Sequence, residues 1–163
     1  MKSIRYRCLL IILISLLSGC ASVNTGSLFQ KELLKDNKAN VYIYRPDVFP
    51  ASFISPTLYV DGEKTFNLAE SSYVALSLPL GKHTFETRDE GNLLTACVVS
   101  GFKFDLASND DHYIRWEPFI SETKEYFNPI TFYTVTVEFS ADIKIVSELQ
   151  AIPEIQQYRK VIK

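Results

Sequence analysis

The sequence predicts an all-β protein, an antiparallel β-sandwich of about seven to eight strands with a short C-terminal helix. Two observations lead to this prediction. Short apolar and aromatic runs with alternating polarity recur along the chain, and Gly, Pro and Asp-Gly turn signals separate them. The chain has 163 residues, of which 47% are hydrophobic and 22% charged, which suits one globular domain. We therefore expect a single sandwich domain over residues 40–163.

Residues 1–19 have the features of a secretory signal peptide. Lys2, Arg5 and Arg7 form a basic start, and residues 8–17 are almost entirely apolar. A helix that spans a bilayer takes about twenty apolar residues, so this stretch is too short to cross one. The alternatives are a cleaved signal peptide and an uncleaved anchor or buried helix. The polar residues that follow favour cleavage.

The end of this segment, Leu17-Ser18-Gly19-Cys20, resembles the lipobox of bacterial lipoprotein precursors. The resemblance implies cleavage before Cys20 and attachment of a diacylglycerol to its sulfur. Two or three acyl chains anchor a protein stably to a membrane, whereas one does not. Ala21, in place of Asp, resembles the pattern of lipoproteins sorted to the outer membrane. We therefore expect a lipid-anchored protein of that membrane, on its periplasmic face, with the cell surface as the alternative.

Residues 20–39 are expected to connect the lipid to the domain. Leu28, Phe29, Leu33 and Leu34 have the spacing of one or two amphipathic helical turns, and strand alternation is missing. The alternatives for this segment are therefore a short helix and an irregular linker.

Eight later segments have strand character. Asp61-Gly62 is predicted to join the second and third as a tight hairpin, and Pro79-Leu80-Gly81 to join the fourth and fifth as another. A closing helix is predicted over 153–162, because Ile155, Tyr158 and Ile162 lie on one helical face. The predicted strands are 41–45, 57–60, 64–68, 73–78, 82–88, 96–106, 112–117 and 131–139, with 143–146 as a further short run.

The charge balance excludes one class of partner. Cleavage after residue 19 removes three of the 17 basic residues and none of the 19 acidic ones, leaving a net charge of -5. No basic run lies in the body of the chain, and nucleic-acid binding needs such a run to neutralise phosphates. We therefore expect no nucleic-acid partner.

Four motifs in the first half of the mature chain resemble a domain-of-unknown-function family of Gram-negative lipoproteins. The VDG and GxH segments are also similar to the hairpins of PEGA domains, which are small surface-exposed β-sandwiches. This resemblance covers about half of the mature chain, implies a sandwich, and supplies no catalytic residues. The motifs are Tyr42-Ile43-Tyr44-Arg45-Pro46, Val60-Asp61-Gly62, Ser72-Tyr73 and Pro79-Leu80-Gly81-Lys82-His83.

The residue types in these motifs suit turns and strand ends. Gly62 and Gly81 tolerate a positive φ, and Asp61 can accept hydrogen bonds from a turn backbone. A structural role is the prediction for the set, and a binding role for Arg45 or His83, or for the tyrosines of the first motif, is the alternative.

Catalysis, metal binding and cofactors are not expected. The two histidines, His83 and His112, lie in no known catalytic or metal-binding spacing. A calcium site near residues 105–117, where four carboxylates cluster, is the alternative to a solvated turn. Cys97 is expected to be a small buried hydrophobe, because its neighbours are apolar and no cation that would stabilise a thiolate lies nearby.

One long connection, residues 117–130, is the candidate contact surface, since loops carry many binding residues. Two functions of different classes follow. The first is a non-enzymatic envelope protein that presents a β-sandwich for protein contacts, and the second is a glycan- or peptidoglycan-binding module that uses stacked aromatics. The alternative for the connection itself is that it folds back and its aromatics fill the sandwich. The aromatic candidates are Trp116, Phe119, Tyr126 and Phe127.

Overall fold

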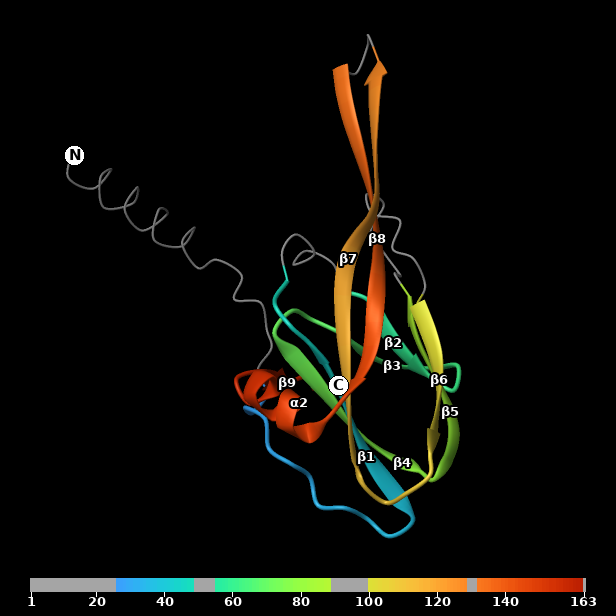
Figure 1. Ribbon diagram of the computed structural model, residues 1–163, viewed down its shortest axis with the longest axis vertical. Coiled ribbons are helices and arrows are strands. Elements are labelled where there is room, and N and C mark those ends of the chain that lie inside the picture. The colour runs from blue at the N-terminus through green and yellow to red at the C-terminus, as the bar shows by residue number, and fades with distance from the viewer. Residues whose placement is uncertain (1–25, 49–54, 89–99, 129–131, 163) are drawn as a thin grey trace, which may run out of the picture.

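The computed structural model describes residues 26–48, 55–88, 100–128 and 132–162, and for residues 124–128 and 132–139 it describes the backbone alone. In these ranges the chain forms two β-sheets and one short helix (Figure 1), which confirms the predicted all-β sandwich. Cys20, Cys97 and the predicted signal peptide lie outside the described residues. The elements are β1 Lys38–Arg45, β2 Thr57–Val60, β3 Glu63–Asn67, β4 Ser72–Pro79, β5 Gly81–Arg88, β6 Ser100–Leu106, β7 Asp111–Asn128, β8 Phe132–Val146, α2 Glu148–Ile155 and β9 Arg159–Lys160.

The first sheet, sheet A, has the strand order β8-β7-β1-β4-β9, and the second, sheet B, has the order β3-β2-β5-β6. Most neighbouring strands are antiparallel, as predicted. Two pairs are parallel, β1 with β7 and β4 with β9, so sheet A is mixed. Parallel pairs join segments far apart in the chain, which alternation within each strand does not reveal.

The two predicted hairpins have different outcomes. β2 and β3 pair antiparallel across Asp61 and Gly62, whose φ angles of 53° and 82° are both positive, as a type I′ turn requires. The second prediction is wrong, because β4 pairs with β1 in sheet A whereas β5 pairs with β2 and β6 in sheet B. Gly81, at φ 130°, therefore turns a corner between the two sheets.

The main core lies between the two sheets. Val41 and Ile43 of β1 point into it and pack with residues of sheet B such as Leu58 and Phe85. The neighbouring Tyr42 and Tyr44 are also fully buried, on the other face of sheet A. A strand covered on both faces tends to be apolar on both, which explains why residues 41–44 of β1 lack polar alternation.

The outer face of sheet A is covered by residues 26–37, which we call the strap, and by α2. Phe29 of the strap meets Tyr42 and Tyr73 edge to face at 5.2 Å. Gly26 lies against β9, where a Cβ would come within 1.8 Å of the Lys160 carbonyl oxygen. The predicted amphipathic helix in this segment is wrong, because these residues run extended over the sheet and bond to it. Of the expected connecting segment 20–39, the described part is thus packed against the body.

The C-terminal helix lies earlier than predicted. α2 spans Glu148–Ile155 and contains Pro153, while the predicted helix would begin at that proline. Ser147 adopts an extended conformation and its carbonyl accepts the Ala151 N–H at 2.9 Å, so the helix starts there. Tyr158 follows the helix, and Arg159–Lys160 then pair with β4 as β9. No helix among the described residues is long and apolar enough to span a bilayer.

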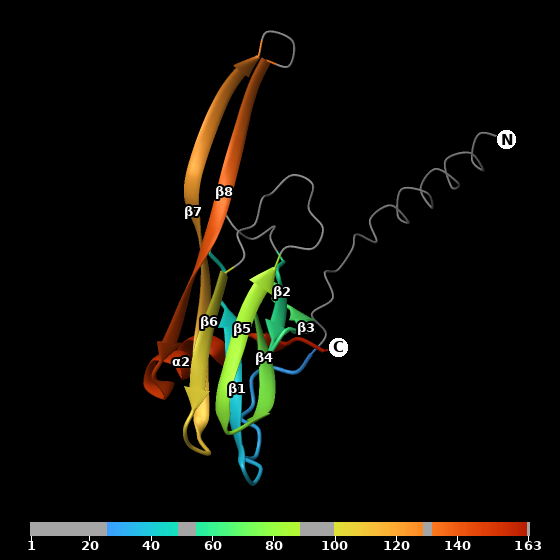
Figure 2. The same ribbon diagram turned by 90° about the vertical axis from the view of Figure 1, so that its right-hand side faces the viewer.

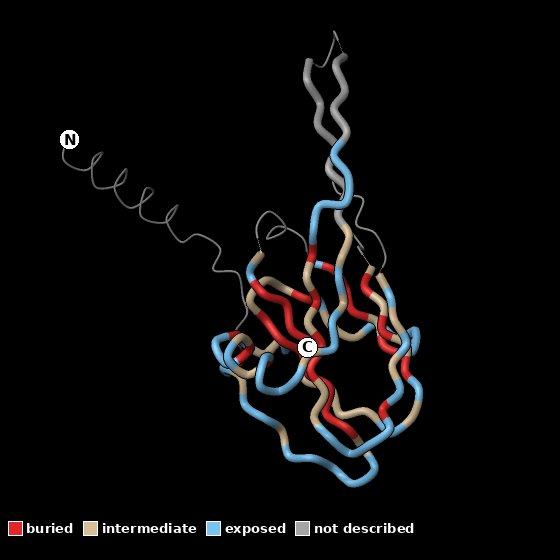
Figure 3. The backbone as a smooth tube through the Cα atoms, viewed as in Figure 1, coloured by how far each residue is buried: buried red, intermediate tan, exposed pale blue. Residues whose placement is uncertain are grey.

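The predicted loop over residues 117–130 is the main correction to the topology. Residues up to Asn128 belong to β7, which pairs antiparallel with β8 over nearly its whole length. The two strands leave the sandwich together and project far beyond it (Figure 2), and we call their part beyond Pro118 and Ala141 the arm. The buried residues lie in the body, and the first described residues of the arm are exposed (Figure 3).

Candidate functional site

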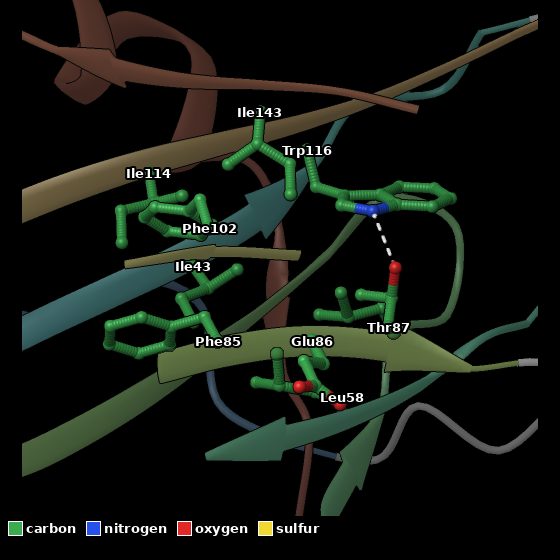
Figure 4. Close-up of a pocket in the computed structure, with 10 residues that line it drawn as sticks. Ile43, Leu58, Phe85, Glu86, Thr87, Phe102, Ile114, Trp116 and Ile143 are labelled. Atoms are coloured by element: carbon green, nitrogen blue, oxygen red, sulfur yellow. Dashed lines mark hydrogen bonds between the residues drawn. The ribbon is translucent and has the colours of Figure 1, made fainter. Parts of the chain in front are cut away.

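Trp116, one of the candidate contact residues, lies inside the sandwich. It is only 5% exposed, and its indole N–H donates to Thr87 Oγ1 at 3.3 Å (Figure 4). The gap that it lines with Phe85 and Ile143, among others, holds about 10 Å³, which is about the least that one water needs. Trp116 is therefore part of the core, and the alternative interpretation, that aromatics of this segment fill the sandwich, holds for this residue.

Phe119, the next candidate, lies where the arm leaves the body. It is 45% exposed, and Ile120 beside it is 42% exposed. The register sets Phe119 opposite Ser140, and a bulge follows between Ile120 and Glu122. The base of the arm therefore exposes two large apolar side chains in succession.

A groove of about 400 Å³ lies at the base of the arm. Phe119 contributes an aromatic wall, and Asp142 and Lys144 of β8 contribute charged groups. Its volume falls within the range of small-molecule sites, about 300–1,000 Å³. The residues that line the groove are Val48, Glu117, Pro118, Phe119, Ile120, Asp142 and Lys144.

Charged side chains in and beside this groove form a chain of ion pairs. Lys144 lies 3.2 Å from Asp142 and 3.5 Å from Glu117, and Glu117 in turn accepts a hydrogen bond from Arg115 at 2.9 Å. The carboxylate of Asp142, and then that of Glu117, raise the pKa of Lys144. Arg115 continues the chain to Glu154 of α2 at 3.1 Å. The groove thus combines exposed apolar surface with surface charges that can rearrange around a partner.

Tyr126 and Phe127, the last two candidates, belong to the outer part of β7. The register sets Tyr126 opposite Thr134 and Phe127 opposite Tyr133. Their side chains lie outside the described part of the chain. Of the four candidates, the structure thus places Trp116 in the core, Phe119 at the groove, and the backbone of the other two further along the arm.

The VDG and GxH motifs meet in space. The carboxylate of Asp61 accepts a hydrogen bond from the Thr84 N–H at 2.9 Å and lies 2.7 Å from Nδ1 of His83. Nε2 of His83 lies 2.9 Å from the carbonyl oxygen of Pro79. One histidine therefore ties the β2–β3 turn to the corner between the sheets. Sequence reasoning misses this contact, because the two residues lie on different turns and only the motif spacing hints at a link.

Burial and hydrogen bonding act on these two groups in opposite directions. The Thr84 N–H lowers the pKa of Asp61; burial opposes this effect, and His83 adds to the lowering. Burial tends to lower the pKa of His83, but the Asp61 carboxylate and the Pro79 carbonyl raise it above its ordinary value. With both ring nitrogens engaged, His83 serves as a structural link in this conformation.

Arg45 of the first motif is a buried cation. It is 1% exposed, and its Nη1 donates to the carbonyl oxygen of Leu68 at 2.8 Å. Its guanidinium carbon lies 5.3 Å from the centre of the Trp116 ring, within the range of a cation–π contact. The tyrosines of the motif point the other way, where Tyr44 donates to Glu154 at 3.0 Å. Burial, and then this bond, raise the pKa of Tyr44.

The remaining polar candidates are engaged in local contacts. The ring of His112 meets that of Phe104 edge to face at 5.3 Å. Asp111 pairs with Lys31 of the strap at 3.0 Å, and Asp110 accepts a hydrogen bond from Ser108. Within the described residues, no group of three His, Cys, Asp or Glu side chains is arranged to hold a metal ion.

A family model whose description is "Protein of unknown function (DUF2846)" matches residues 35–129, more than half of the chain. The match begins just before β1 and ends just after β7, and so it includes the motifs and the outgoing strand of the arm. No curated protein and no solved structure matches the chain.

Proposed function

The chain belongs to the DUF2846 family of proteins of unknown function, and we propose that its role is that of a non-enzymatic, lipid-anchored envelope protein whose β-sandwich makes protein contacts through the arm. The anchor in this proposal is the lipid on Cys20, and the location is the periplasmic face of the bacterial outer membrane. The role is accessory or structural, with a second protein as the partner.

The arm is the observation that carries this proposal. It extends from the body without a covering layer from the described residues, and its base exposes Phe119 and Ile120. Exposed apolar surface rimmed by polar groups is typical of protein interaction sites. β8 also lies at the end of sheet A, and no strand among the described residues pairs with its outer edge, which could therefore receive another strand, a common mode of peptide recognition.

The proposal that the protein acts without catalysis rests on where its histidines lie. His83 has both ring nitrogens in hydrogen bonds, and His112 packs against an aromatic ring. We expect the purified protein to have no esterase, phosphatase, glycosidase or peptidoglycan-hydrolase activity above background. Activity that disappears in the His83→Ala, His112→Ala double variant would overturn this part of the proposal.

Anchoring and partner contact are tested separately. Cys20→Ser should abolish incorporation of labelled palmitate and leave an uncleaved precursor; label that persists in the variant would contradict lipid attachment there. For the partner, a photo-crosslinking amino acid replaces Phe119 in living cells. We expect a defined crosslinked protein band for this position.

Leu80 provides the matched control, because it is also a large exposed apolar residue, at 41%, but lies on the corner between β4 and β5. The probe at Leu80 should not give the band that Phe119 gives. An identical pattern from both positions, or no band from Phe119, would count against the arm as the contact element.

A second candidate function is glycan binding, which the groove favours. Phe119 supplies an aromatic face for a sugar ring, and Glu117 and Asp142 supply carboxylates that can accept hydroxyl hydrogen bonds. Trp116 cannot contribute, since it is buried. Cosedimentation with purified peptidoglycan would test this function. Binding that falls severalfold in Phe119→Ala but not in Leu80→Ala would support it, and no binding by the wild type would exclude peptidoglycan as the ligand.

A further inference from the structure

The open edge of β8 carries an inference about the partner, which rests on the proposed function of the arm as a contact element. β8 spans Phe132–Val146 and stands first in the order of sheet A, with no described strand on its far side. Such an edge offers unpaired N–H and C=O groups to any strand of matching pattern. The register with β7 continues without a shift on the β8 side, so the edge is regular along its length.

The two faces of β8 differ in polarity. Odd-numbered residues share the face that points into the sandwich, where Ile143 lines the core gap, and even-numbered residues share the outer face. Ile145 on the inner face is 56% exposed although Ile114, its partner on β7, is fully buried. At the register positions of the inner face the sequence has Val137, Phe139, Ala141, Ile143 and Ile145, and at those of the outer face it has Glu138, Ser140, Asp142 and Lys144.

We propose that the occupant of this edge is β8 of a second copy of the chain, paired antiparallel about a twofold axis at Ala141. An antiparallel pair keeps apolar faces together only when odd-numbered residues oppose odd-numbered ones. Centring the pair on Ala141 meets this condition. It joins residues 136–146 of each copy and extends sheet A continuously from one copy into the other.

Charge selects this register from its neighbours. With the axis at Ala141, Lys144 of each copy opposes Glu138 of the other, and the symmetry makes this contact twice. Asp142 opposes Ser140, a hydroxyl that can donate to it. With the axis at residue 140, Glu138 would oppose Asp142, and like charges in direct opposition are destabilising. With the axis at residue 139, no charges of opposite sign meet.

Lys144, the cation that this pairing needs, is accessible. The side chain of Lys144 is half exposed, and its contacts with Asp142 and Glu117 are surface ion pairs, which cost little to rearrange. Ile143 and Ile145 oppose Phe139 and Val137 of the second copy. Aliphatic and aromatic pairs of this kind are the main stabilising contacts between strands.

A cysteine at the axis tests the geometry in native membranes with the full-length protein. In an antiparallel pair, directly opposed Cα atoms lie about 4.5 or 5.5 Å apart, and both distances permit a disulfide. Ala141→Cys should therefore give a disulfide-linked dimer on non-reducing gels. Ser140→Cys is the matched control, because two copies of residue 140 would be diagonal neighbours, about 7–8 Å apart. The wild-type protein, which also contains Cys97, gives the background level of disulfide-linked dimer.

Charge exchange tests the register. In the Ala141→Cys background, Lys144→Glu should lower the crosslinked fraction about tenfold, since symmetry introduces two repulsive pairs. Adding Glu138→Lys should restore the fraction. A dimer yield no higher from Ala141→Cys than from Ser140→Cys overturns the proposal, as does failure of the exchanged pair to restore crosslinking in a protein with the wild-type circular dichroism spectrum.

These results are separable from the proposed function. If the Phe119 probe captures a different protein while Ala141→Cys forms no dimer, the arm is a contact element but its partner is not a second copy. If neither captures anything, both proposals fail. Repeating the disulfide readout on whole-cell extracts, which contain the protein with or without a lipid on Cys20, makes the result independent of lipid attachment.

Discussion

The two halves of β7 belong to one strand but have different surroundings. In the body, Ile114 and Trp116 face sheet B and are almost fully buried. Beyond Pro118, the same strand continues with Phe119 and Ile120, which are 45% and 42% exposed. The pairing with β8 is continuous through both halves apart from one bulge. Thus one strand is a core element for its first part and a surface element for its second.

This difference shows what an alternating strand pattern does and does not specify. Apolar side chains on one face of a strand require a cover, and in the body sheet B of the same chain provides it. No described element of the chain covers the arm. Contacts inside the chain cover the apolar residues of the body, and we propose that a partner covers those exposed at the base of the arm.

The largest expected effect compares Trp116 with Phe119. Trp116→Ala should lower the free energy of unfolding by about 3–5 kcal/mol, since it empties a buried aromatic site. Phe119→Ala should change it by less than about 1 kcal/mol, because the ring is almost half exposed. Urea denaturation of the protein produced without residues 1–20 measures both. Equal losses of unfolding free energy in the two variants would contradict the assignment of Trp116 to the core and Phe119 to the surface.

Arg45 is a second buried residue of the body whose replacement should cost more stability than that of Phe119. Arg45→Ala should cost about 2–3 kcal/mol, because it leaves the Leu68 carbonyl without its 2.8 Å donor and removes packing against Trp116. Arg45→Met keeps most of the volume and should cost less than the alanine variant. The same denaturation assay applies. If Arg45→Met lowers the free energy of unfolding more than Arg45→Ala does, packing is not the main contribution of this side chain.

A smaller effect is expected at the β2–β3 turn. Gly62 has φ 82°, and a Cβ added to it would meet no atom within 4 Å, so conformation rather than space restricts this position. Gly62→Val should lower the free energy of unfolding by about 1 kcal/mol, since a β-branched side chain disfavours a positive φ. Gly62→Asn, which tolerates this region better, is the control. An unchanged urea midpoint for valine would show that the turn relaxes without cost.

The smallest effect is a pH dependence of the body. The pKa of His83 is raised in the fold, so its contribution to stability is full below about pH 6.5 and is lost as pH rises through the folded pKa. The pKa of Asp61 is lowered, so its contribution is present above about pH 4 and is lost as pH falls through the folded value. The pair therefore contributes most between about pH 4 and 6.5.

Asp61→Asn should remove this dependence. The difference in unfolding free energy between wild type and variant should grow as pH falls from 8 to 6, by at most about 1 kcal/mol, because half of the Asp61 side chain faces solvent. Denaturant curves at several pH values in this range measure it. A difference that stays constant with pH would mean that the histidine does not change its charge in the fold.

Much of the fold is predictable from local pattern, and the failures have a common cause. β2 and the Asp61-Gly62 turn follow directly from strand alternation and turn chemistry. The corner at Gly81 and the parallel β9 depend on which sheet each strand joins, which local pattern does not specify. Pro153 has the sequence signature of a helix start, but the helix begins at Glu148 and has the proline in its last turn.

The candidate site shows the same limit. An aromatic residue outside a recognised strand suggests a contact role, which points to Phe119, although that strand in fact continues past it. Trp116, at the end of the predicted strand 112–117, is wrongly given the same role, since its burial depends on Thr87 and Arg45 from distant strands. Sequence reasoning also misses Lys144 and Asp142, because only pairing with β7 brings them beside Phe119.

The strap has a consequence for distances at the membrane. Since Gly26 is fixed against β9, the chain from a lipidated Cys20 to the body can span at most about 22 Å, however it is arranged. The arm is longer, because residues 119–128 alone advance about 33 Å at ~3.3 Å per residue. The reach of the protein is then a property of a folded element of fixed length. Deleting two consecutive residues from each of the two arm strands would shorten that reach by about 7 Å and leave the span between Cys20 and the body unchanged.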